Sequence, residues 1–232
     1  MSVHILFDFD GTLVDSLEVA FTAFRQVGPE FGCAPLSRER LERLRGMHAL
    51  EVVHALGVPV YRLPQLATRM RRAMRADLME TAPIEGIGEV LETLLQRGHR
   101  LGILSSNARA SVNEYVRRHR LPGLDAVNGG TGLFGKASAL RRQARAQRID
   151  PRCLVYVGDE LRDLEAARDA GVRFAAVAWG YTPLESLAAA GPDFQCRHPR
   201  DLLSIDAGLP ERLESTGCFG SEGDFRKSSQ RV

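Results

Sequence analysis

The chain has 232 residues, of which 44% are hydrophobic, so it can form one large α/β domain or a medium-sized domain that carries a small inserted one. Its 31 Lys and Arg residues nearly balance its 29 Asp and Glu residues, and a formal net charge of +2 argues against nucleic acid or an anionic membrane surface as the main partner. No apolar run approaches the roughly 20 residues that a membrane span needs, so we expect a globular protein.

The first predicted strand covers residues 4–8, and two acidic residues, Asp8 and Asp10, lie at its end. Because side chains alternate along a strand, both carboxylates are expected to leave its carboxyl end on the same side. Neighbouring carboxylates cost free energy unless a cation or a reaction uses them. Gly11 and Thr12 follow, and they predict a tight turn whose free backbone N–H groups suit an anion. This stretch predicts a site for a cation and an anionic substrate.

Helical patterns fill residues 17–82, and no convincing strand occurs among them. We expect these residues to form a small all-helical domain that is inserted after the first strand, with hinges near Ser16 and Pro83. The α/β core is then expected to comprise residues 1–16 and 83–210.

The rest of the chain alternates between apolar runs and helical patterns. The apolar runs predict buried strands at 100–106, 153–159 and 174–180, and the helical patterns lie near 86–97, 109–120, 136–148 and 161–170. Such alternation is typical of a parallel sheet with helices on its faces, so the predicted fold class is α/β with a doubly wound, Rossmann-like parallel sheet. Residues 211–232 are rich in Gly, Ser and charge, and they predict a flexible tail.

A second group of acids lies at the end of the predicted strand 153–159. Asp159 ends the strand, Glu160 is next to it, and Asp163 follows about one helical turn later. Carboxylates are hard oxygen ligands, and Mg²⁺ usually takes one or two of them, keeps several waters and binds the substrate phosphate. The acids at the two strand ends therefore predict Mg²⁺ as the cofactor.

Two further groups suit an anionic substrate. Lys136 follows Gly135 and opens a predicted helix, where it supplies a mobile cation near the same edge of the sheet. Ser105 ends an apolar run and can donate a hydroxyl hydrogen bond to a phosphate, although Ser106 or Asn107 could serve instead.

The order and spacing of these residues resemble the four sequence motifs of the haloacid dehalogenase-like (HAD) hydrolase superfamily. The matching residues are Asp8-Phe9-Asp10-Gly11-Thr12, Ser105, Lys136 and Gly158-Asp159 through Asp163. The resemblance covers roughly residues 4–205. The helical insertion between the first and second motifs resembles the cap of the phosphoglycolate phosphatase-like branch, and the stretch AWGYTPLESLAAAGPDF is similar to the usual C-terminal part of that branch.

This resemblance implies a phosphoric monoester hydrolase with two catalytic carboxylates. Asp8 would be the nucleophile that forms an aspartyl-phosphate, and Asp10 would protonate the leaving alkoxide and later accept a proton from water. The resemblance also implies that Mg²⁺ is bound by Asp8, the backbone carbonyl of Asp10 and Asp159. Lys136 and Ser105 would hold the phosphoryl oxygens.

Four further residues have possible roles near the metal or in the cap. Asp163 is implied to steady Lys136 or the metal site. Glu160 departs from the branch, which often has Ser there, and it could add negative charge at the metal or face solvent. In the expected cap, Gly46 can bend a helix junction towards the cleft, and Arg45 could meet a second anionic group of the substrate. Phosphoglycolate, a sugar phosphate and a nucleotide all remain open as substrates.

Alternative functions use the same residues. The stretch from Gly130 to Lys136 fits a nucleotide-binding P-loop, but Ala137 stands where a Ser or Thr hydroxyl would bind Mg²⁺, and "LDAVNGG" before it is a poor strand. Asp10 argues against dehalogenase or phosphonatase chemistry, because neither reaction releases an alkoxide that needs this acid. A β-phosphoglucomutase-like phosphomutase stays open. So does a non-catalytic protein that binds phosphorylated ligands or a partner, although the intact Asp8 and Asp10 speak against it.

The N-terminus and the cysteines bear on the cellular location of the protein. The chain enters a predicted strand without a charged leader, and the four cysteines show no Cys-x-x-Cys spacing, so neither secretion, nor a zinc site, nor a disulfide framework is indicated. We expect a cytoplasmic monomer or dimer that acts on a small-molecule phosphomonoester, without a nucleic-acid or membrane partner.

Overall fold

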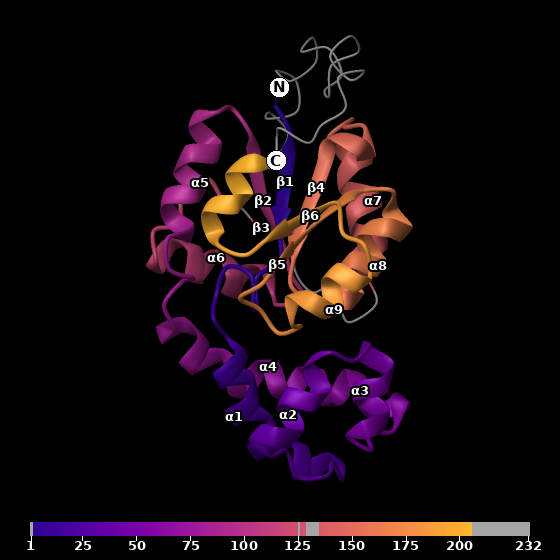
Figure 1. Cartoon of the computed structure of the whole chain (residues 1–232). Helices are drawn as coiled ribbons and strands as arrows, with labels where there is room; N and C mark the ends of the chain where they lie inside the picture. Colours follow the sequence, from indigo (N-terminus) through magenta and orange to yellow (C-terminus); the bar gives the residue numbers. More distant parts are fainter. Residues whose placement is uncertain (1, 125, 129–134, 206–232) are drawn as a thin grey trace.

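A six-stranded sheet forms the centre of the computed structural model, which describes residues 2–124, 126–128 and 135–205 (Figure 1). Neighbouring strands are all parallel, in the order β3-β2-β1-β4-β5-β6. The strands are β1 (His4–Phe7), β2 (Arg100–Leu104), β3 (Ala126–Asn128), β4 (Leu154–Gly158), β5 (Arg173–Val177) and β6 (Phe194–Cys196). The predicted α/β fold class with a parallel sheet is confirmed, whereas the predicted tail, residues 211–232, lies outside the described residues.

The strand order reverses at β1: the chain runs from β1 through β2 to β3 at one edge, and then crosses back to β4 on the other side of β1. In open parallel sheets, ligands bind at the carboxyl ends of the strands where the strand order reverses in this way. One strand corrects the sequence analysis: "LDAVNGG" is a poor strand by its composition, but Ala126–Asn128 pair with β2 and form the edge strand β3.

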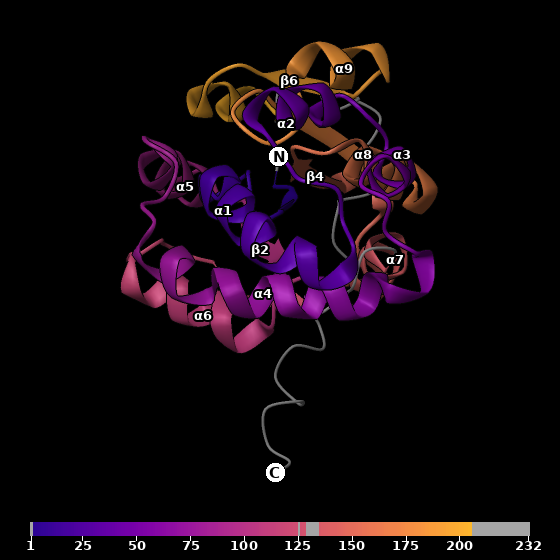
Figure 2. The same ribbon diagram turned by 90° about the horizontal axis from the view of Figure 1, so that it is seen from below.

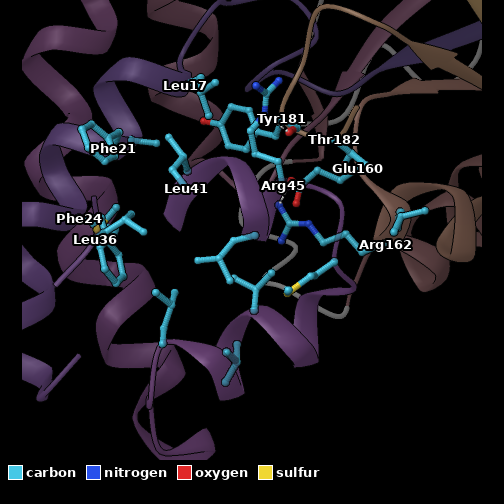
Figure 3. Close-up of a pocket in the computed structure, with 18 of the residues that line it drawn as sticks. Leu17, Phe21, Phe24, Leu36, Leu41, Arg45, Glu160, Arg162, Tyr181 and Thr182 are labelled. Atoms are coloured by element: carbon cyan, nitrogen blue, oxygen red, sulfur yellow. Dashed lines mark hydrogen bonds and ion pairs between the residues drawn. The ribbon is translucent and has the colours of Figure 1, made fainter. Parts of the chain in front are cut away.

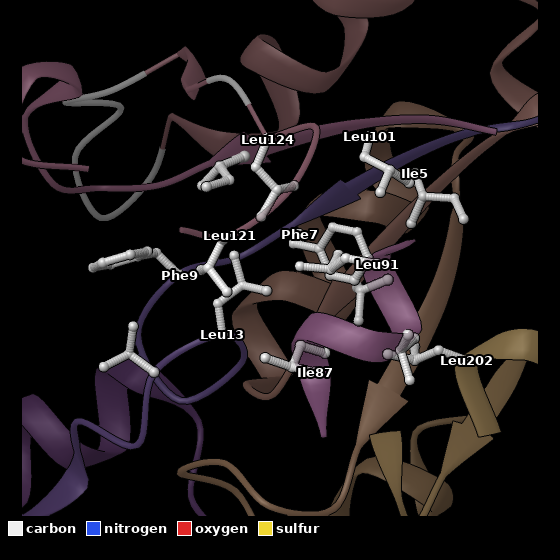
Figure 4. Close-up of a cluster of buried hydrophobic side chains, with 14 of the residues drawn as sticks. Ile5, Phe7, Phe9, Leu13, Ile87, Leu91, Leu101, Leu121, Leu124 and Leu202 are labelled. Atoms are coloured by element: carbon white, nitrogen blue, oxygen red, sulfur yellow. The ribbon is translucent and has the colours of Figure 1, made fainter. Parts of the chain in front are cut away.

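Helices cover both faces of the sheet. The helices on one face are α5 (Ile87–Gln96) and α6 (Arg109–Arg118); those on the other face are α7 (Lys136–Ala146), α8 (Leu161–Ala170) and α9 (Leu184–Ala189). Side chains alternate along β1, and this explains the two layers. Ile5 and Phe7 pack into the cluster that includes α5, where Figure 4 shows them near Leu91. Leu6 points to the other face and packs into the cluster that includes α7 and α8. Burial of each such side chain stabilises the fold by roughly 1.5–3 kcal/mol.

Residues 17–82, which we call the helical segment, lie beyond the carboxyl edge of the sheet (Figure 1). Their α-helices are α1 (Leu17–Val27), α2 (Arg38–Arg45), α3 (Ala49–Ala55) and α4 (Leu63–Glu80), joined by the short 3₁₀ helices Gly28–Phe31 and Val60–Arg62. They enclose an apolar cluster of their own, which includes Val27, Phe31 and Leu66 and is separate from the two clusters on the sheet. The segment therefore has an independent core.

Local sequence signals set several helix ends. The Ser37 hydroxyl accepts a hydrogen bond from the backbone N–H of Arg40 at 3.2 Å and so caps α2. Pro64 lies in the first turn of α4, where its missing N–H has no partner to lose. Gly171 ends α8 with a φ of 70°, a left-handed conformation that glycine adopts without strain. No helix in the described part of the chain combines the length and the apolar character that crossing a bilayer requires.

His4 in β1 gives the fold a measurable pH dependence. The residue is only 5% exposed, its Nδ1 has no hydrogen-bond partner among the described residues, and burial, helped by the charge of Arg100, lowers the pKa of His4 to about 4. In the unfolded chain the imidazole takes up a proton below about pH 6.5, so protons favour unfolding between that pH and the folded-state pKa. We expect His4 to cost about 2 kcal/mol of unfolding free energy as the pH falls from 7.5 to 4.5.

Urea unfolding of the wild type and of His4→Leu at pH 7.5 and 4.5 measures this contribution. The leucine variant removes the titrating group at similar volume, so its unfolding free energy should fall less on acidification than that of the wild type. Because the difference between the two proteins is compared, the carboxylates that titrate in the same range cancel. Parallel pH dependences of the two proteins would contradict the prediction.

Candidate active site

The carboxyl ends of β1 and β4 lie side by side, and an acidic residue follows each strand. Phe7 pairs with Val157 in the sheet, and the backbone N–H of Asp8 donates to the Val157 carbonyl at 2.8 Å. Asp159 directly follows Gly158, the last residue of β4. Two acids from distant parts of the sequence are thereby brought to one edge of the sheet.

The chain turns sharply after Asp10. Gly11 has a φ of 72°, which confirms the predicted tight turn. The N–H groups do not stay free, however, because that of Gly11 donates to the Val14 carbonyl at 2.9 Å and that of Thr12 donates to the Phe9 carbonyl at 3.3 Å. The expectation of free N–H groups for an anion at Gly11 and Thr12 is therefore wrong: the turn uses them to close itself.

A buried lysine connects two buried carboxylates across the site. Lys136 is the first residue of α7 and Asp163 lies in the first turn of α8, and these two helices pack against each other. The Lys136 Nζ lies 2.6 Å from Asp8 Oδ2 and 2.5 Å from Asp163 Oδ1. All three side chains are at most 5% exposed. Asp163 thus contacts Lys136 as expected, and the other roles of the two residues stay predictions.

Burial and charge have opposite effects on the pKa values of Asp8 and Lys136. Burial raises the pKa of Asp8 to about 7, although the ammonium of Lys136 acts in the opposite direction. Burial alone would lower the pKa of Lys136, but the carboxylates of Asp163 and Asp8 outweigh it and hold the pKa well above its ordinary value. Lys136 is therefore a permanent cation in contact with Asp8.

A residue in the loop after β2 forms a hydrogen bond with Asp10. Asp10 Oδ2 accepts a hydrogen bond from Asn107 Nδ2 at 2.7 Å, while Asp10 Oδ1 is buried and has no partner among the described residues. Burial raises the pKa of Asp10, and the hydrogen-bonding side chains of Ser16 and Asn107 oppose the rise. Ser105 Oγ accepts the backbone N–H of Asn107 at 3.0 Å, and Ser106 is half-buried beside it. The sequence predicts Asn107 only as a substitute for Ser105, and residue spacing does not predict its contact with Asp10.

Asp159 is fully buried, and both of its carboxylate oxygens have partners. Oδ1 accepts the Thr12 hydroxyl at 2.8 Å, and Oδ2 accepts the backbone N–H of Tyr181 at 2.7 Å. Burial raises the pKa of Asp159 well above its ordinary value, and the charges of Glu160, Asp163 and Asp8 add to the rise. Sequence reasoning missed Tyr181, whose only signal is its place directly after the apolar run 174–180.

The site carries carboxylates that suit a divalent cation. Oxygen atoms of Asp8, Glu160 and Asp163 lie within 4.8 Å of one another, and Asp163 Oδ2 is buried without a hydrogen-bond partner among the described residues. Such a set of hard, incompletely paired oxygens fits a cation such as Mg²⁺. Glu160 also forms an ion pair with Arg162. The grouping includes Glu160 in place of Asp159, so the ligand set of Asp8, Asp10 and Asp159 stays a prediction.

A family model described as haloacid dehalogenase-like hydrolase matches residues 5–177. The chain belongs to the haloacid dehalogenase-like hydrolase family. This confirms the resemblance that the four motifs indicated. The HAD fold is also found in a haloacid dehalogenase-like hydrolase from Streptococcus pneumoniae, whose solved structure matches with a TM-score of 0.70 at 23% identity, over 88% of this chain and 97% of that one.

Several curated relatives of this HAD protein are phosphatases. It is 36% identical over 200 residues to a phosphoglycolate phosphatase of Synechococcus elongatus, which covers 86% of this chain and 94% of the relative. It is 26% identical over 211 residues to an N-acetylmuramic acid 6-phosphate phosphatase of Pseudomonas aeruginosa, over 87% of this chain and 93% of the relative. The predicted class, a phosphoric monoester hydrolase of the phosphoglycolate phosphatase-like branch, agrees with both.

Arg45 forms one of the contacts between the helical segment of this HAD protein and its core. Arg45 Nε donates to the carbonyl of Tyr181 at 2.7 Å, its Nη2 donates to the carbonyl of Gly180 at 3.0 Å, and its Nη1 pairs with Glu42 at 2.9 Å. The next residue, Gly46, lies close to the core, since a Cβ there would be 3.1 Å from Ser186 Oγ. The structure commits Arg45 to protein partners, and the specificity role of Arg45 and Gly46 stays a prediction.

A cavity of about 370 Å³ lies between the helical segment and the core (Figure 3). Its walls in the helical segment are mostly apolar, and Phe21 and Leu41 are among them. Its polar end is formed by Arg45, Glu160 and Arg162, and the Glu160 carboxylate also lies within 4.8 Å of Asp8 and Asp163. The cavity therefore reaches the acidic site from the side of the helical segment.

Gly180 is required by the close approach of Asp159. A Cβ at position 180 would lie 2.1 Å from the Cβ of Asp159, so Gly180→Ala must displace one of the two backbones. We expect the variant to lose about 1–3 kcal/mol of unfolding free energy and at least about tenfold in phosphatase activity, because Asp159 moves. Urea unfolding and phosphate release measure the two effects.

Gly88→Ala is the matched control for this variant. Gly88 lies inside α5, and a Cβ there would meet no atom within 4 Å. Alanine is the better helix former, so Gly88→Ala should keep its activity and gain about 0.5–1 kcal/mol of unfolding free energy. Equal behaviour of the two variants would show that contact with Asp159 is not what requires Gly180.

Proposed function

We propose that this HAD protein is a Mg²⁺-dependent phosphatase that hydrolyses a small-molecule phosphomonoester through an aspartyl-phosphate on Asp8. The observation that carries the proposal is the buried contact of Asp8 with Lys136, at 2.6 Å, at the carboxyl edge of the sheet and beside Asp10. A carboxylate in contact with a permanent cation can meet an anionic phosphoryl group, because the cation offsets the repulsion between them.

Asp8 is the proposed nucleophile. An oxygen of its carboxylate attacks phosphorus, and the bond between phosphorus and the alcohol oxygen breaks with its electron pair on the leaving alkoxide. Water then attacks the phosphorus of the aspartyl-phosphate and releases inorganic phosphate and the free carboxylate. Lys136, and Ser105 with Ser106 at the end of β2, hold the phosphoryl oxygens during both steps.

Asp10 is the proposed acid and base. Its Oδ1 is buried without a partner among the described residues, and burial raises its pKa, so the carboxyl can hold a proton beside an ionised neighbour. It donates this proton to the alkoxide in the first step and takes one from the attacking water in the second. Asn107, at 2.7 Å from Oδ2, orients the carboxyl while Oδ1 exchanges the proton.

The acidic residues of the site would hold the Mg²⁺. We assign it to Asp8, the backbone carbonyl of Asp10 and Asp159, with Glu160 and Asp163 close by. When bound, the ion neutralises charge on the phosphoryl oxygens and so favours approach of the Asp8 carboxylate.

The substrate is proposed to be a small phosphomonoester, and phosphoglycolate is the first candidate. The relative that is 36% identical over 200 residues is a phosphoglycolate phosphatase, and a sugar phosphate is named for the relative at 26% identity. The helical segment 17–82 would act as a cap that excludes water while phosphate transfer occurs. The proposal includes a cytoplasmic location.

Phosphate release from a panel of phosphomonoesters tests the proposal. We expect Mg²⁺-dependent release of inorganic phosphate from at least one of 2-phosphoglycolate, a sugar phosphate, a nucleotide and p-nitrophenyl phosphate, and a fall to background when the metal is removed with EDTA. Interconversion of sugar phosphate isomers without phosphate release would instead identify a phosphomutase. Binding of phosphorylated compounds without either reaction would identify a non-catalytic protein.

A further inference from the structure

A second cavity lies on the other side of Asp10, between α4 of the helical segment and α6 of the core. These helices lie side by side in Figure 2, and a cavity of about 200 Å³ opens between them. We call it the arginine cavity. The described residues that line it are Phe9, Thr68, Arg71, Arg72, Arg75, Leu78, Met79, Asn107, Ala108 and Ser111.

The arginine cavity has a strong positive charge. Arg71, Arg72 and Arg75 lie on one face of α4, and no acidic residue is among the described residues that line the cavity. Like charges three and four positions apart destabilise a helix unless something neutralises them. Arg69, on the same helix, shows the usual solution, because it pairs with Glu30 at 2.9 Å.

The cavity arginines have little of this compensation. Arg72 has no hydrogen bond or ion pair with any described residue, and Arg71 has only the Thr68 hydroxyl, at 3.2 Å. Arg75 approaches Glu114 no closer than 3.5 Å, and both side chains of that pair are more than half exposed. Guanidinium groups bind carboxylates and phosphates through paired hydrogen bonds, so this arrangement is suited to an anionic ligand.

The cavity is linked to the proposed acid through one shared side chain. Asn107 lines the cavity and donates to Asp10 Oδ2 at 2.7 Å. An anion in the cavity would therefore be one side chain away from the proposed acid. The hydroxyl group of Ser111, in the first turn of α6, is a further donor at the same place.

We propose that the arginine cavity binds a second anionic group of the substrate, a carboxylate or a phosphate, while the phosphomonoester faces Asp8. This inference rests on the proposed function, and it names the substrate class. The preferred substrates are phosphomonoesters whose alcohol part carries its own negative charge. Arg71, Arg72 and Arg75 then determine specificity, which is the role predicted above for Arg45.

The test compares substrates with and without the second anion. Values of kcat/KM are measured for 2-phosphoglycolate, which adds a carboxylate, for fructose 1,6-bisphosphate, which adds a phosphate, and for p-nitrophenyl phosphate, which adds no second anion. In the triple variant Arg71→Gln, Arg72→Gln and Arg75→Gln, the ratio of kcat/KM for the doubly anionic substrate to that for p-nitrophenyl phosphate should fall by about tenfold or more, mainly through KM. A fall for only one of the two anionic substrates identifies the anion as carboxylate or phosphate.

Arg69→Gln is the matched control, because Arg69 lies on the same helix but pairs with Glu30 and does not line the arginine cavity. It should keep the wild-type ratio, and Arg72→Lys should keep most of it because it retains the charge. If the triple variant does not fold, Arg72→Gln alone should lower the ratio by about threefold, since Arg72 is exposed and has no partner to lose.

Two results would overturn the inference. One is a ratio in the triple variant within twofold of the wild type for both doubly anionic substrates. The other is an equal loss in Arg69→Gln. If the wild type releases phosphate from no compound of the full panel, the proposed function itself fails and the inference falls with it, so the two failures are distinguishable.

Discussion

Asp8→Asn is expected to lower phosphate release by at least about a thousandfold, because the amide oxygen is too weak a nucleophile to attack phosphorus. The change is isosteric and leaves Lys136 in contact with Asp163, so the fold should persist. Phosphate release with the best substrate of the panel, together with circular dichroism, measures both parts of the prediction. Labelling with ³²P-substrate should detect no phosphoenzyme in the variant.

Asp15→Asn is the control for loss of one carboxylate near the same loop. Asp15 is exposed, and its replacement should leave phosphate release within about twofold of the wild type. A folded Asp8→Asn variant that kept more than about a tenth of the wild-type activity would exclude Asp8 as the nucleophile. The carboxylates of Asp10 and Asp159 would then be the groups to examine.

The strands could be predicted because each is a buried apolar run, and the errors in their ends are informative. All four predicted strands, 4–8, 100–106, 153–159 and 174–180, continue past the carboxyl end of the observed strand. The extra residues include Asp8, Ser105, Asp159 and Gly180. These residues are buried as strand residues are, but they bend the chain to form the site. Burial without regular structure is therefore what marks the site in this sequence.

The two unpredicted strands depend on their neighbours. β3 and β6 have three residues each, include Asn128 and Gln195, and lie at the two edges of the sheet. Their conformation comes from pairing with β2 and β5, which a local pattern does not contain. Composition therefore predicts the central strands better than the edges.

The acids of the site were predictable from the motifs, but their partners were not. Alternation predicts that Asp8 and Asp10 point the same way, yet β1 ends at Phe7 and the turn at Gly11 sets the direction of Asp10. Asn107 lies in a different loop, 97 residues away in the chain, and donates a hydrogen bond to Asp10. Such contacts depend on how loops cross at the sheet edge, which short-range periodicity does not describe.

The choice of lysine at position 136 follows from the space between two carboxylates. The sequence uses arginine for nearly all its basic residues and has only two lysines, Lys136 and Lys227. A compact ammonium fits at 2.6 Å from Asp8 and 2.5 Å from Asp163, whereas a planar guanidinium is larger and needs paired acceptors. We expect Lys136→Arg to lose most of its activity even though the charge is kept.

Lys136→Met should have the largest effect on stability. Removal of the ammonium leaves Asp8 and Asp163 buried without a counter-charge, which costs about 3–5 kcal/mol of unfolding free energy. The Asp8 carboxyl can relieve part of this cost by taking up a proton, because burial raises its pKa, and a folded-state pKa above the unfolded value makes its contribution to stability largest at low pH. The destabilisation, measured by urea unfolding in EDTA, should therefore be smaller at pH 5 than at pH 8.

A double-mutant cycle separates the ion pair from simple loss of packing. Lys136→Met combined with Asp163→Asn should be less destabilised than the sum of the single variants, by about 1–3 kcal/mol. The exposed pair Arg69 and Glu30, at 2.9 Å, is the matched control and should show a coupling below about 1 kcal/mol in the same cycle. If the buried pair couples no more strongly than the exposed one, Lys136 does not neutralise Asp163. The charge balance that prepares Asp8 for reaction would then have another source.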